Sequence, residues 1–335
     1  MPLTNVLKKS LARQSTQSGI SRWAPLGLIL SMTACTSSNV ASRLQPFVVG
    51  IGPQQYSGAF DAAGQAFTKE LGVHSLRLAF NHGDADFGVN WAAQNGIGVL
   101  YMLGYGVGCD ARTVSGRQCY ADRSAGLAQK YGNKVQYYEV WNEWNGIFGP
   151  FGGWRENQAI PAVAAYTDLL CQTYKAVKAV QPNAKVVGGV TAGTGTSFIR
   201  NMLDGGAGNC MDVVSVHPYP FSEHSEFNVP YNSSATVMAN KFIKAVTAVD
   251  ALVRQKTGRT IPIVVTEEGI VDNPANEQRT ADYLTQIYAR SKLLPFIEGI
   301  WWFNLEDNID GTYGLLRSNN TKKPAFAAFK AAANK

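Results

Sequence analysis

The sequence contains few residues of the kinds that bind metal ions. Only four histidines and five cysteines occur among its 335 residues, and no two cysteines are spaced as Cys-x-x-Cys. No two histidines fall at the end of the same predicted strand. A catalytic zinc ion takes about three protein ligands, often histidines, brought to one place. The sequence therefore disfavours a metal-dependent hydrolase, and we expect neither a metal nor another cofactor.

Clusters of positive charge are missing from most of the chain. The formal net charge is +6, but Lys8, Lys9, Arg13 and Arg22 all lie in the first 34 residues, which hold no acidic residue. Without that segment, 26 basic residues stand against 24 acidic ones, and no Lys/Arg cluster remains. A nucleic-acid-binding surface needs a basic patch. We therefore expect no nucleic-acid partner.

The first 45 residues have the pattern of an export signal followed by a tether. A basic leader precedes the apolar run Ala24–Leu30, which is too short to span a bilayer by itself and is typical of a secretory signal. The end of this segment resembles a bacterial lipoprotein signal, in which Cys35 would be lipidated and become the mature N-terminus. We expect a signal peptide in residues 1–34 and a flexible, Ser-rich tether in residues 35–45.

The residues around Cys35 indicate where the mature protein would lie. Thr36, rather than aspartate, follows the cysteine, which in such signals usually permits transfer to the outer membrane. We expect a lipid anchor to the bacterial outer membrane, with the protein on its periplasmic or surface side. Met32 stands where leucine is usual, so export without a lipid anchor is the alternative.

Four further cysteines indicate disulfide bonds. An even number of cysteines in an exported chain suggests pairing. Cys109 and Cys119 bracket a short loop and are expected to pair with each other, which leaves Cys171 to pair with Cys210. Metal ligation is the weaker alternative, because the histidines are far away in the sequence.

Strand and helix patterns alternate through the rest of the chain, residues 46–335, which we expect to be one catalytic domain. The predicted strands, mostly continuous apolar runs as in parallel sheets, are Phe47–Gly52, Val73–Phe80, Ile97–Leu103, Val135–Glu143, Lys185–Val190, Asp212–Tyr219, Ile263–Gly269 and Gly299–Leu305. Helical patterns are clearest in Ala159–Val180, Val237–Lys256, Glu277–Leu293 and Ala325–Ala333. Eight strands, each followed by a helix, predict an α/β fold, a single (β/α)8 TIM barrel. A doubly wound sheet is the alternative, but no Gly-rich phosphate-binding turn follows the first strand.

Polar and aromatic residues gather where the predicted strands end, which is where such barrels place their catalytic groups. Along the chain they are Arg77, Asn142, Glu143, His217, Tyr219, Thr266, Glu267, Trp301 and Trp302. Two of these strand ends carry carboxylates. Cleavage of a glycosidic bond needs two, because one protonates the departing oxygen and the other attacks the anomeric carbon or activates water.

In this order along the chain, these residues resemble the retaining glycoside hydrolases of the large (β/α)8 superfamily called clan A. Within the clan, the chain is most similar to family 39 and its exopolysaccharide-cleaving bacterial members, with family 5 as the alternative. The resemblance implies that Glu143 is the general acid/base and Glu267 the nucleophile. It also implies that Asn142 contacts the sugar 2-hydroxyl, that Tyr219 hydrogen-bonds the nucleophile, and that Trp302 forms the floor of the subsite for the attacked sugar.

The two acids would need different surroundings. Arg77 beside Glu267 would keep the nucleophile ionised and oriented, although a structural ion pair is an alternative role for this arginine. Glu268 is a second candidate nucleophile, but neighbouring side chains on a strand face opposite ways, and the family's spacing to Gly269 selects Glu267. His217 is expected to bind substrate, with a hydrogen bond in the core as the alternative.

Aromatic residues are expected both at the site and in the core. Four follow the predicted acid/base in a Gly-rich loop without helical or strand period: Trp144, Phe148, Phe151 and Trp154. Because sugar rings stack on flat aromatic faces, we expect Trp144 and Trp154 to line a substrate wall. Trp301 should face the opposite way to Trp302 and pack between the barrel and its helices.

These observations favour an exported, lipid-anchored retaining β-glycosidase, expected to be a monomer and to act within a polysaccharide chain near the cell surface. Its two catalytic carboxyl groups should lie about 5–5.5 Å apart. The alternative is a barrel lipoprotein that binds glycan without cleaving it, for example in polysaccharide export. The presence of both Glu143 and Glu267 argues against that alternative.

Overall fold

The computed structural model of the protein describes residues 46–53, 60–79, 85–105, 108–221 and 226–335. The predicted signal peptide and tether, together with Cys35, lie outside the described residues. Within the described ranges, no helix is both long enough and apolar enough to cross a membrane.

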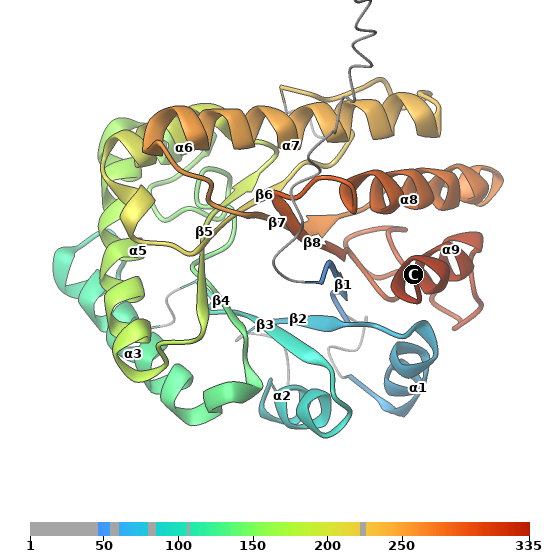
Figure 1. Ribbon diagram of the computed structural model, residues 1–335, viewed down its shortest axis with the longest axis horizontal. Coiled ribbons are helices and arrows are strands. Elements are labelled where there is room, and N and C mark those ends of the chain that lie inside the picture. The colour runs from blue at the N-terminus through green and yellow to red at the C-terminus, as the bar shows by residue number, and fades with distance from the viewer. Residues whose placement is uncertain (1–45, 54–59, 80–84, 106–107, 222–225) are drawn as a thin grey trace, which may run out of the picture. The chain divides into compact units, whose positions relative to one another are not determined.

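Eight parallel strands close into a barrel in the order in which they occur in the chain, and β1 pairs with β8 (Figure 1). The strands are β1 (Val48–Ile51), β2 (Ser75–Ala79), β3 (Gly98–Met102), β4 (Tyr137–Glu139), β5 (Lys185–Ala192), β6 (Val213–His217), β7 (Ile263–Glu268) and β8 (Ile297–Trp302). Each overlaps one predicted strand. The single (β/α)8 barrel expected from the sequence is confirmed.

Helices surround the ring of strands (Figure 1). They are α1 (Ala62–Leu71), α2 (Ala85–Gln94), α3 (Val114–Tyr131), α4 (Trp154–Gln158), α5 (Ile160–Val180), α6 (Thr196–Asp204), α7 (Ala235–Thr257), α8 (Glu277–Ser291) and α9 (Pro324–Ala333), with short 3-10 turns η1 (Gly132–Lys134), η2 (Ala207–Asn209) and η3 (Pro274–Asn276). Local sequence explains their ends: Asp61 accepts a hydrogen bond from the Gly64 amide at the start of α1, and Gly72 ends that helix at a φ of 69°. The four clearest helix predictions are confirmed.

Apolar residues pack against both faces of the barrel sheet, in two separate groups. The larger lies between strands and helices, and the smaller one fills the interior around Leu100, Tyr137 and Trp301. Trp301 and Trp302 face opposite ways, as expected, but on the reverse of the expected faces: Trp301 lies inside the barrel, and Trp302 packs against Tyr283 of α8. Both side chains are fully buried.

A glycine on the neighbouring strand explains this reversal. Gly50 of β1 is paired with Trp301, and a Cβ atom at Gly50 would lie 2.2 Å from the Trp301 ring. The missing side chain leaves space for the indole inside the barrel, where its Nε1–H donates to Ser75 Oγ at 3.2 Å. Trp302 therefore has no surface to offer a sugar, and its predicted role as a subsite floor is contradicted.

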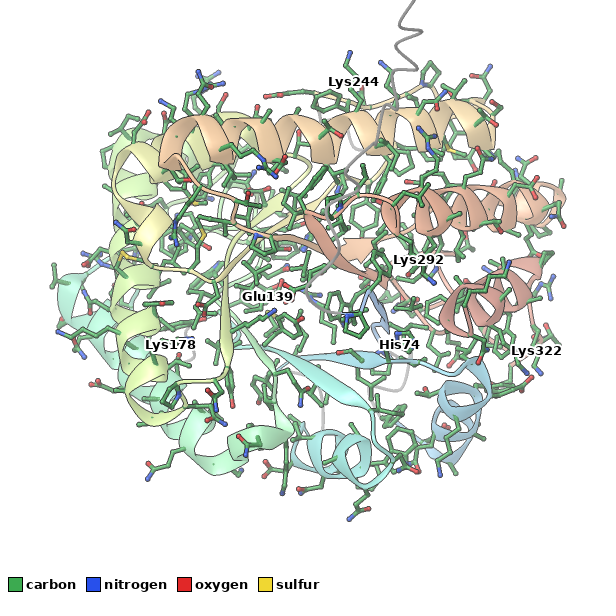
Figure 2. All side chains as sticks on the ribbon, in the orientation of Figure 1. His74, Glu139, Lys178, Lys244, Lys292 and Lys322 are labelled. Carbon is green, nitrogen blue, oxygen red and sulfur yellow. A yellow bond between two sulfur atoms is a disulfide. The ribbon has the colours of Figure 1, made fainter. Side chains whose placement is uncertain are left out.

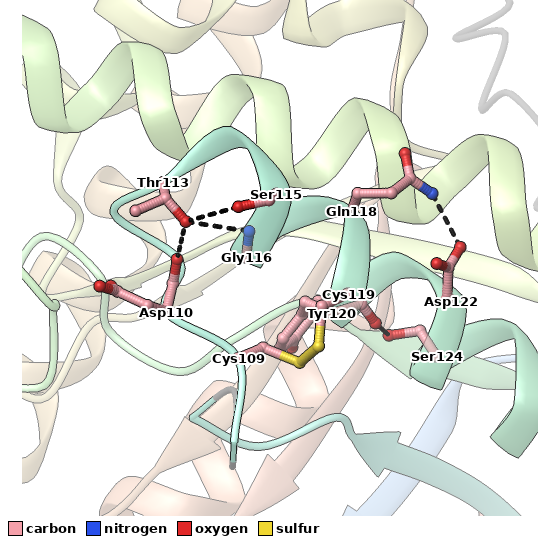
Figure 3. The surroundings of a disulfide bond; sticks show 10 residues. All are labelled: Cys109, Asp110, Thr113, Ser115, Gly116, Gln118, Cys119, Tyr120, Asp122 and Ser124. Atoms are coloured by element: carbon pink, nitrogen blue, oxygen red, sulfur yellow. Dashed lines mark hydrogen bonds between the residues drawn. A yellow bond between two sulfur atoms is a disulfide. The ribbon is translucent and has the colours of Figure 1, made fainter.

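Both predicted disulfides are present. The Cα atoms are 5.7 Å apart in Cys109–Cys119 and 4.7 Å apart in Cys171–Cys210, within the usual range for a disulfide. The first bond ties the loop after β3 to α3 (Figure 3). The second ties α5 to the residue that follows η2.

Candidate active site

The backbone turns sharply just before the predicted acid/base. β4 ends at Glu139, four residues earlier than predicted, and Trp141 and Glu143 then adopt positive φ angles of 69° and 49°. Such angles are strained for residues other than glycine. The turn is held by the Glu143 amide, which donates to Val190 O at 2.8 Å, and by the Trp141 indole, which donates to Phe148 O at 3.0 Å. Hydrogen bonds, rather than strand geometry, thus place the Glu143 side chain.

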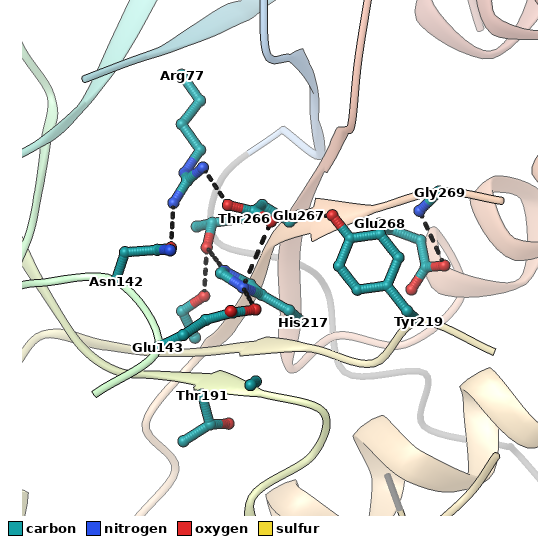
Figure 4. A network of polar contacts seen from close by, with 12 residues as sticks. Arg77, Asn142, Glu143, Thr191, His217, Tyr219, Thr266, Glu267, Glu268 and Gly269 are labelled. Carbon is teal, nitrogen blue, oxygen red and sulfur yellow. Dashed lines mark hydrogen bonds and ion pairs between the residues drawn. The ribbon is translucent and has the colours of Figure 1, made fainter. Parts of the chain in front are cut away.

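The two candidate catalytic carboxylates meet beside one imidazole. An oxygen of Glu143, an oxygen of Glu267 and a ring nitrogen of His217 all lie within 4.8 Å of one another. His217 Nδ1 is 2.9 Å from Glu143 Oε1 and 3.7 Å from Glu267 Oε2 (Figure 4). The glutamate side chains are 16% and 13% exposed, so both can be reached from outside the protein.

Glu267 is surrounded by groups that favour its ionised form. Arg77 Nη1 donates to Oε1 at 2.5 Å and the Tyr219 hydroxyl donates to Oε2 at 2.9 Å (Figure 4). Burial alone would raise the pKa of this carboxyl, but the charges of His217 and Arg77 and the hydrogen bond from Tyr219 lower the pKa below its ordinary value. The predicted contacts of Arg77 and Tyr219 with Glu267 are both present.

His217 is fully buried and is bonded on both sides of its ring. Nε2 lies 2.8 Å from Thr266 Oγ1, and Nδ1 faces Glu143. Burial works to lower the pKa of His217, but the charge of Glu267 and the hydrogen bond to Glu143 outweigh it and raise the pKa. The histidine is therefore held between site residues, which leaves it no exposed edge for a sugar.

Glu139 is a site residue that the sequence analysis missed. It is fully buried on β4 and accepts from Arg77 Nε at 2.7 Å, from Arg77 Nη2 at 3.2 Å and from Thr266 Oγ1 at 2.8 Å. Arg77 thus takes part in a buried ion pair and also contacts the candidate nucleophile, which combines the two roles considered for it. The sequence signal that could have revealed it is an acidic residue between the apolar and aromatic residues Tyr138 and Val140.

Asn142 connects this network to an aromatic residue. Its Oδ1 accepts from Arg77 Nη2 at 2.9 Å, and its Nδ2 donates to the Tyr105 hydroxyl at 3.2 Å. The amide is therefore oriented beside Glu143. Its contact with a sugar 2-hydroxyl stays a prediction. Tyr105, just beyond β3, was also missed, and its ring stacks on Phe148, with the ring centroids 5.5 Å apart and a 27° interplanar angle.

The Gly-rich loop contributes less to the site than expected. Trp144 is fully buried, donates to Ala162 O at 3.1 Å and packs against Trp141 and Tyr166, so its predicted place in a substrate wall is wrong. The reason is that Asn157 bonds three backbone groups of the loop and folds it over the Trp144 ring.

Other aromatic residues around the loop keep an accessible face. Phe148 is 44% exposed. Trp154, at the start of α4, is partly exposed, and its predicted sugar contact remains untested. On the Glu267 side, Tyr219 packs edge-on against Phe303 and Tyr313, two partly exposed residues that follow β8 and were not predicted.

Glu143, His217 and Glu267 could each offer one ligand atom to a metal ion. The charge of Arg77, 2.5 Å from Glu267, opposes a bound cation, and the hydrogen bond between Glu143 and His217 already occupies two of the three donor atoms. These contacts suit a proton-transfer site better than a metal centre.

Glu268, the rejected candidate nucleophile, faces away from this site. It is fully buried, and it accepts from the Tyr283 hydroxyl at 3.0 Å and from the Gly269 amide at 3.1 Å. Its burial raises the pKa of the carboxyl to about 8, in spite of these two hydrogen bonds. The expectation that Glu267 and Glu268 face opposite ways is confirmed.

Replacing Glu268 with glutamine is expected to reduce the loss of stability with rising pH. The unfolded chain releases this proton near pH 4.5 and the folded protein only near pH 8. Between these values the unfolded state binds fewer protons, so the free energy of unfolding falls as the pH rises, by up to about 1.4 kcal/mol per pH unit. Thermal unfolding between about pH 5 and about pH 8 should show a smaller decrease for Glu268→Gln than for the wild type. If the stability of the two proteins fell equally over this pH range, the raised pKa of Glu268 would be contradicted.

A cavity of about 610 Å³ lies at the opposite end of the barrel, where it is lined by the first residues of several strands, including Val48, Ser75 and Tyr137. None of the site residues described above lines it. The carboxylate pair at the carboxyl ends of the strands remains the candidate active site.

Solved structures with the same architecture include several glycoside hydrolases. A family 39 enzyme from Bacteroides cellulosilyticus WH2 is 21% identical, with a TM-score of 0.63 over 85% of this chain and 62% of that one. The fold is that of the family 39 glycoside hydrolases. A monomeric β-xylosidase from Caulobacter crescentus CB15 is 16% identical, with a TM-score of 0.62 over 85% of this chain and 67% of that one. An exo-β-1,4-mannosidase from Opitutaceae bacterium strain TAV5 is 12% identical, with a TM-score of 0.63 over 86% of this chain and 58% of that one.

The resemblance expected from the sequence is thus confirmed at the level of the fold. The chain spans about two thirds or less of the length of these three proteins. No protein-family model matches the sequence, and no curated protein matches it.

Proposed function

We propose that the protein is a retaining glycoside hydrolase that cleaves β-linked bonds by double displacement. The observation that supports this most directly is the distance between the candidate carboxylates, whose nearest oxygens lie within 4.8 Å. Retaining enzymes hold their carboxyl groups about 5–5.5 Å apart, whereas inverting enzymes need about 6.5–9.5 Å to admit a water molecule.

The surroundings of each carboxylate suit a different role. Glu267, kept ionised by Arg77 and His217, would attack the anomeric carbon. Glu143 would protonate the departing oxygen and then remove a proton from the incoming water. The first step converts the Glu267 carboxylate into a neutral ester, so the charge beside Glu143 differs between the two steps, as an acid that becomes a base requires.

We propose that the substrate is a polysaccharide and that the protein cleaves its internal linkages. Tyr105 accepts a hydrogen bond from Asn142, the residue before Glu143, and stacks on Phe148. Tyr219 donates to Glu267 and packs against Tyr313. Because sugar rings stack on aromatic faces, this arrangement supports sugar residues bound on both sides of the cleaved bond. The β linkage follows the β-xylosidase and β-mannosidase activities named for similar structures.

The decisive experiment follows the configuration of the first product. With a panel of β-linked polysaccharides, we expect new reducing ends on at least one, and proton NMR should show the β-anomer before mutarotation. EDTA should leave the rate unchanged. An α-anomer formed first would contradict retention. Binding to a polysaccharide without new reducing ends would favour the non-catalytic glycan-binding barrel instead.

We also propose that the protein is an exported monomer, anchored through lipid on Cys35 to the bacterial outer membrane. The basic leader, the apolar run and the cysteine support the anchor, and the monomeric Caulobacter β-xylosidase supports the oligomeric state. Cys35→Ser should move the protein from the membrane fraction to the soluble fraction of exported protein. Membrane association that survives this substitution would contradict a lipid anchor at Cys35.

A further inference from the structure

The buried glutamate of β4, Glu139, has no exposed surface, yet it bonds to Arg77 and Thr266, which contact Glu267 and His217. Figure 2 places Glu139 near the middle of the ring of strands, and Figure 4 shows the network around the neighbouring site residues. We propose that Glu139 is a positioning residue that orients Arg77 toward Glu267 and, through Thr266, fixes the protonated nitrogen of His217. The proposal rests on the proposed function of the two catalytic glutamates.

The first branch of this hydrogen-bond network connects Glu139 to Glu267 through Arg77. Glu139 accepts from both Nε and Nη2 of Arg77, at 2.7 and 3.2 Å, which holds the guanidinium plane from one edge. A planar guanidinium held in this way has little freedom to rotate. Its remaining nitrogen, Nη1, then points at Glu267 Oε1 from 2.5 Å. Glu139 thus determines where the positive charge beside the nucleophile lies.

The second branch of the network connects Glu139 to His217 through Thr266. The Thr266 hydroxyl has one hydrogen, and it must donate this hydrogen to Glu139 Oε1, since an ionised carboxylate only accepts. Toward His217 Nε2, 2.8 Å away, the same oxygen can therefore only accept. The Ser215 hydroxyl, 2.6 Å from Thr266 Oγ1, takes the other lone pair as a second donor. Nε2 of His217 consequently carries a hydrogen in every state.

With Nε2 always protonated, a single hydrogen is shared between His217 Nδ1 and Glu143 Oε1, which are 2.9 Å apart. Either a protonated Glu143 donates to a neutral imidazole, or an imidazolium donates to the Glu143 carboxylate. In the first chemical step this proton goes to the leaving oxygen as the glycosidic bond breaks and the bond to Glu267 forms. In the second step, a proton from water returns to the pair as the sugar–Glu267 ester is cleaved.

The charged groups that face His217 come from several elements. They are Glu139 on β4, Glu143 in the following loop, Glu267 on β7 and Arg77 on β2. Glu139 Oε1 is 3.9 Å from Nε2 and so acts mainly through the Thr266 hydroxyl between them. A role in positioning therefore predicts different consequences for substitutions at Glu139 and at Thr266.

The test uses two variants and two kinds of substrate. Thr266→Val keeps the shape of the side chain but removes the hydroxyl that bonds to Glu139, Ser215 and His217, and it leaves the contacts of Glu139 with Arg77 in place. We expect kcat to fall about 100-fold on natural glycosides, whose leaving groups need a proton. The burst of aryl alcohol from an activated aryl glycoside, which needs no proton, should change less than about 3-fold. Glu139→Gln disturbs both branches, so it should also slow the burst, by about 100-fold, with KM nearly unchanged.

A second buried glutamate provides the matched control. Glu298 lies inside the same barrel, paired with Lys185 at the end away from the site. Glu298→Gln should alter neither the burst rate nor its dependence on the leaving group, whatever it does to thermal stability. Near-UV circular dichroism checks the fold of each variant.

The outcomes separate this proposal from the proposed function. A wild-type protein without glycosidase activity would overturn both. With an active wild type, a folded Glu139→Gln with normal kcat would overturn the positioning role alone. If Glu139→Gln does not fold, the Thr266→Val variant decides. An equal fall in rate on natural glycosides and on the activated aryl glycoside, or no fall on either, would overturn the proposal.

Discussion

Glu267→Ala is expected to abolish turnover of every glycoside, with kcat reduced by about 10⁶-fold, comparable to the loss of a covalent nucleophile in other enzymes. The other carboxylates near the site are unsuited to replace it. Glu139 is bonded to Arg77 and Thr266, and Glu268 faces away from the mouth. The measurement is release of reducing ends together with release of aryl alcohol from an activated aryl β-glycoside.

Azide provides a second readout for the Glu267→Ala protein. A small anion can occupy the space of the missing carboxylate and attack the anomeric carbon from the same face, which should give an α-glycosyl azide. Glu268→Gln is the matched control, since it changes the adjacent carboxylate and should keep normal turnover. Full activity of Glu267→Ala on natural substrates would show that this residue is not the nucleophile.

Glu143→Ala is expected to separate the two chemical steps. The first step on an activated aryl glycoside needs no proton and should survive, whereas hydrolysis of the glycosyl-enzyme lacks its base and should slow by about 10²–10⁴-fold. The intermediate should therefore accumulate, visible as a burst of aryl alcohol and as an increase in the mass of the protein. On natural glycosides, both steps should be slow.

Azide should restore turnover of the Glu143→Ala protein, because this nucleophile needs no general base. Two displacements at the anomeric carbon would give a β-glycosyl azide, the opposite configuration to the product expected from Glu267→Ala. If the two variants gave the reverse pair of products, the roles of Glu143 and Glu267 would be exchanged.

The barrel and the carboxylate pair could be predicted because both depend on patterns that are local in the sequence. Continuous apolar runs identify parallel strands, and the closed topology brings their carboxyl ends to one mouth. Alternation along a single strand allows only one of Glu267 and Glu268 to face the mouth, and the family's spacing to Gly269 selected Glu267; the Glu268 side chain packs toward α8. No long-range information was needed for either prediction.

The errors arose where the position of a side chain depends on residues outside its own strand or turn. Trp301 turns into the barrel because Gly50, at the other end of the chain, leaves space for it. Trp144 is buried because Asn157 folds the intervening loop over it. The role of Glu139 requires knowing that Arg77 lies opposite, and no short motif contains that information.

The location of the site residues also bears on when, during folding, the protein would acquire the proposed activity. Arg77 and Glu267 are 190 residues apart in the chain, and Glu143 and His217 are 74 apart. Contacts between such distant segments form slowly, because the chain must lose much of its freedom before they can stabilise it. The nucleophile and the acid/base come from strands on different sides of the ring, so a partly assembled barrel could present aromatic surfaces to a glycan but could not cleave it. Hydrolysis would therefore begin only with the completed ring, and catalytic activity would report the last stage of assembly.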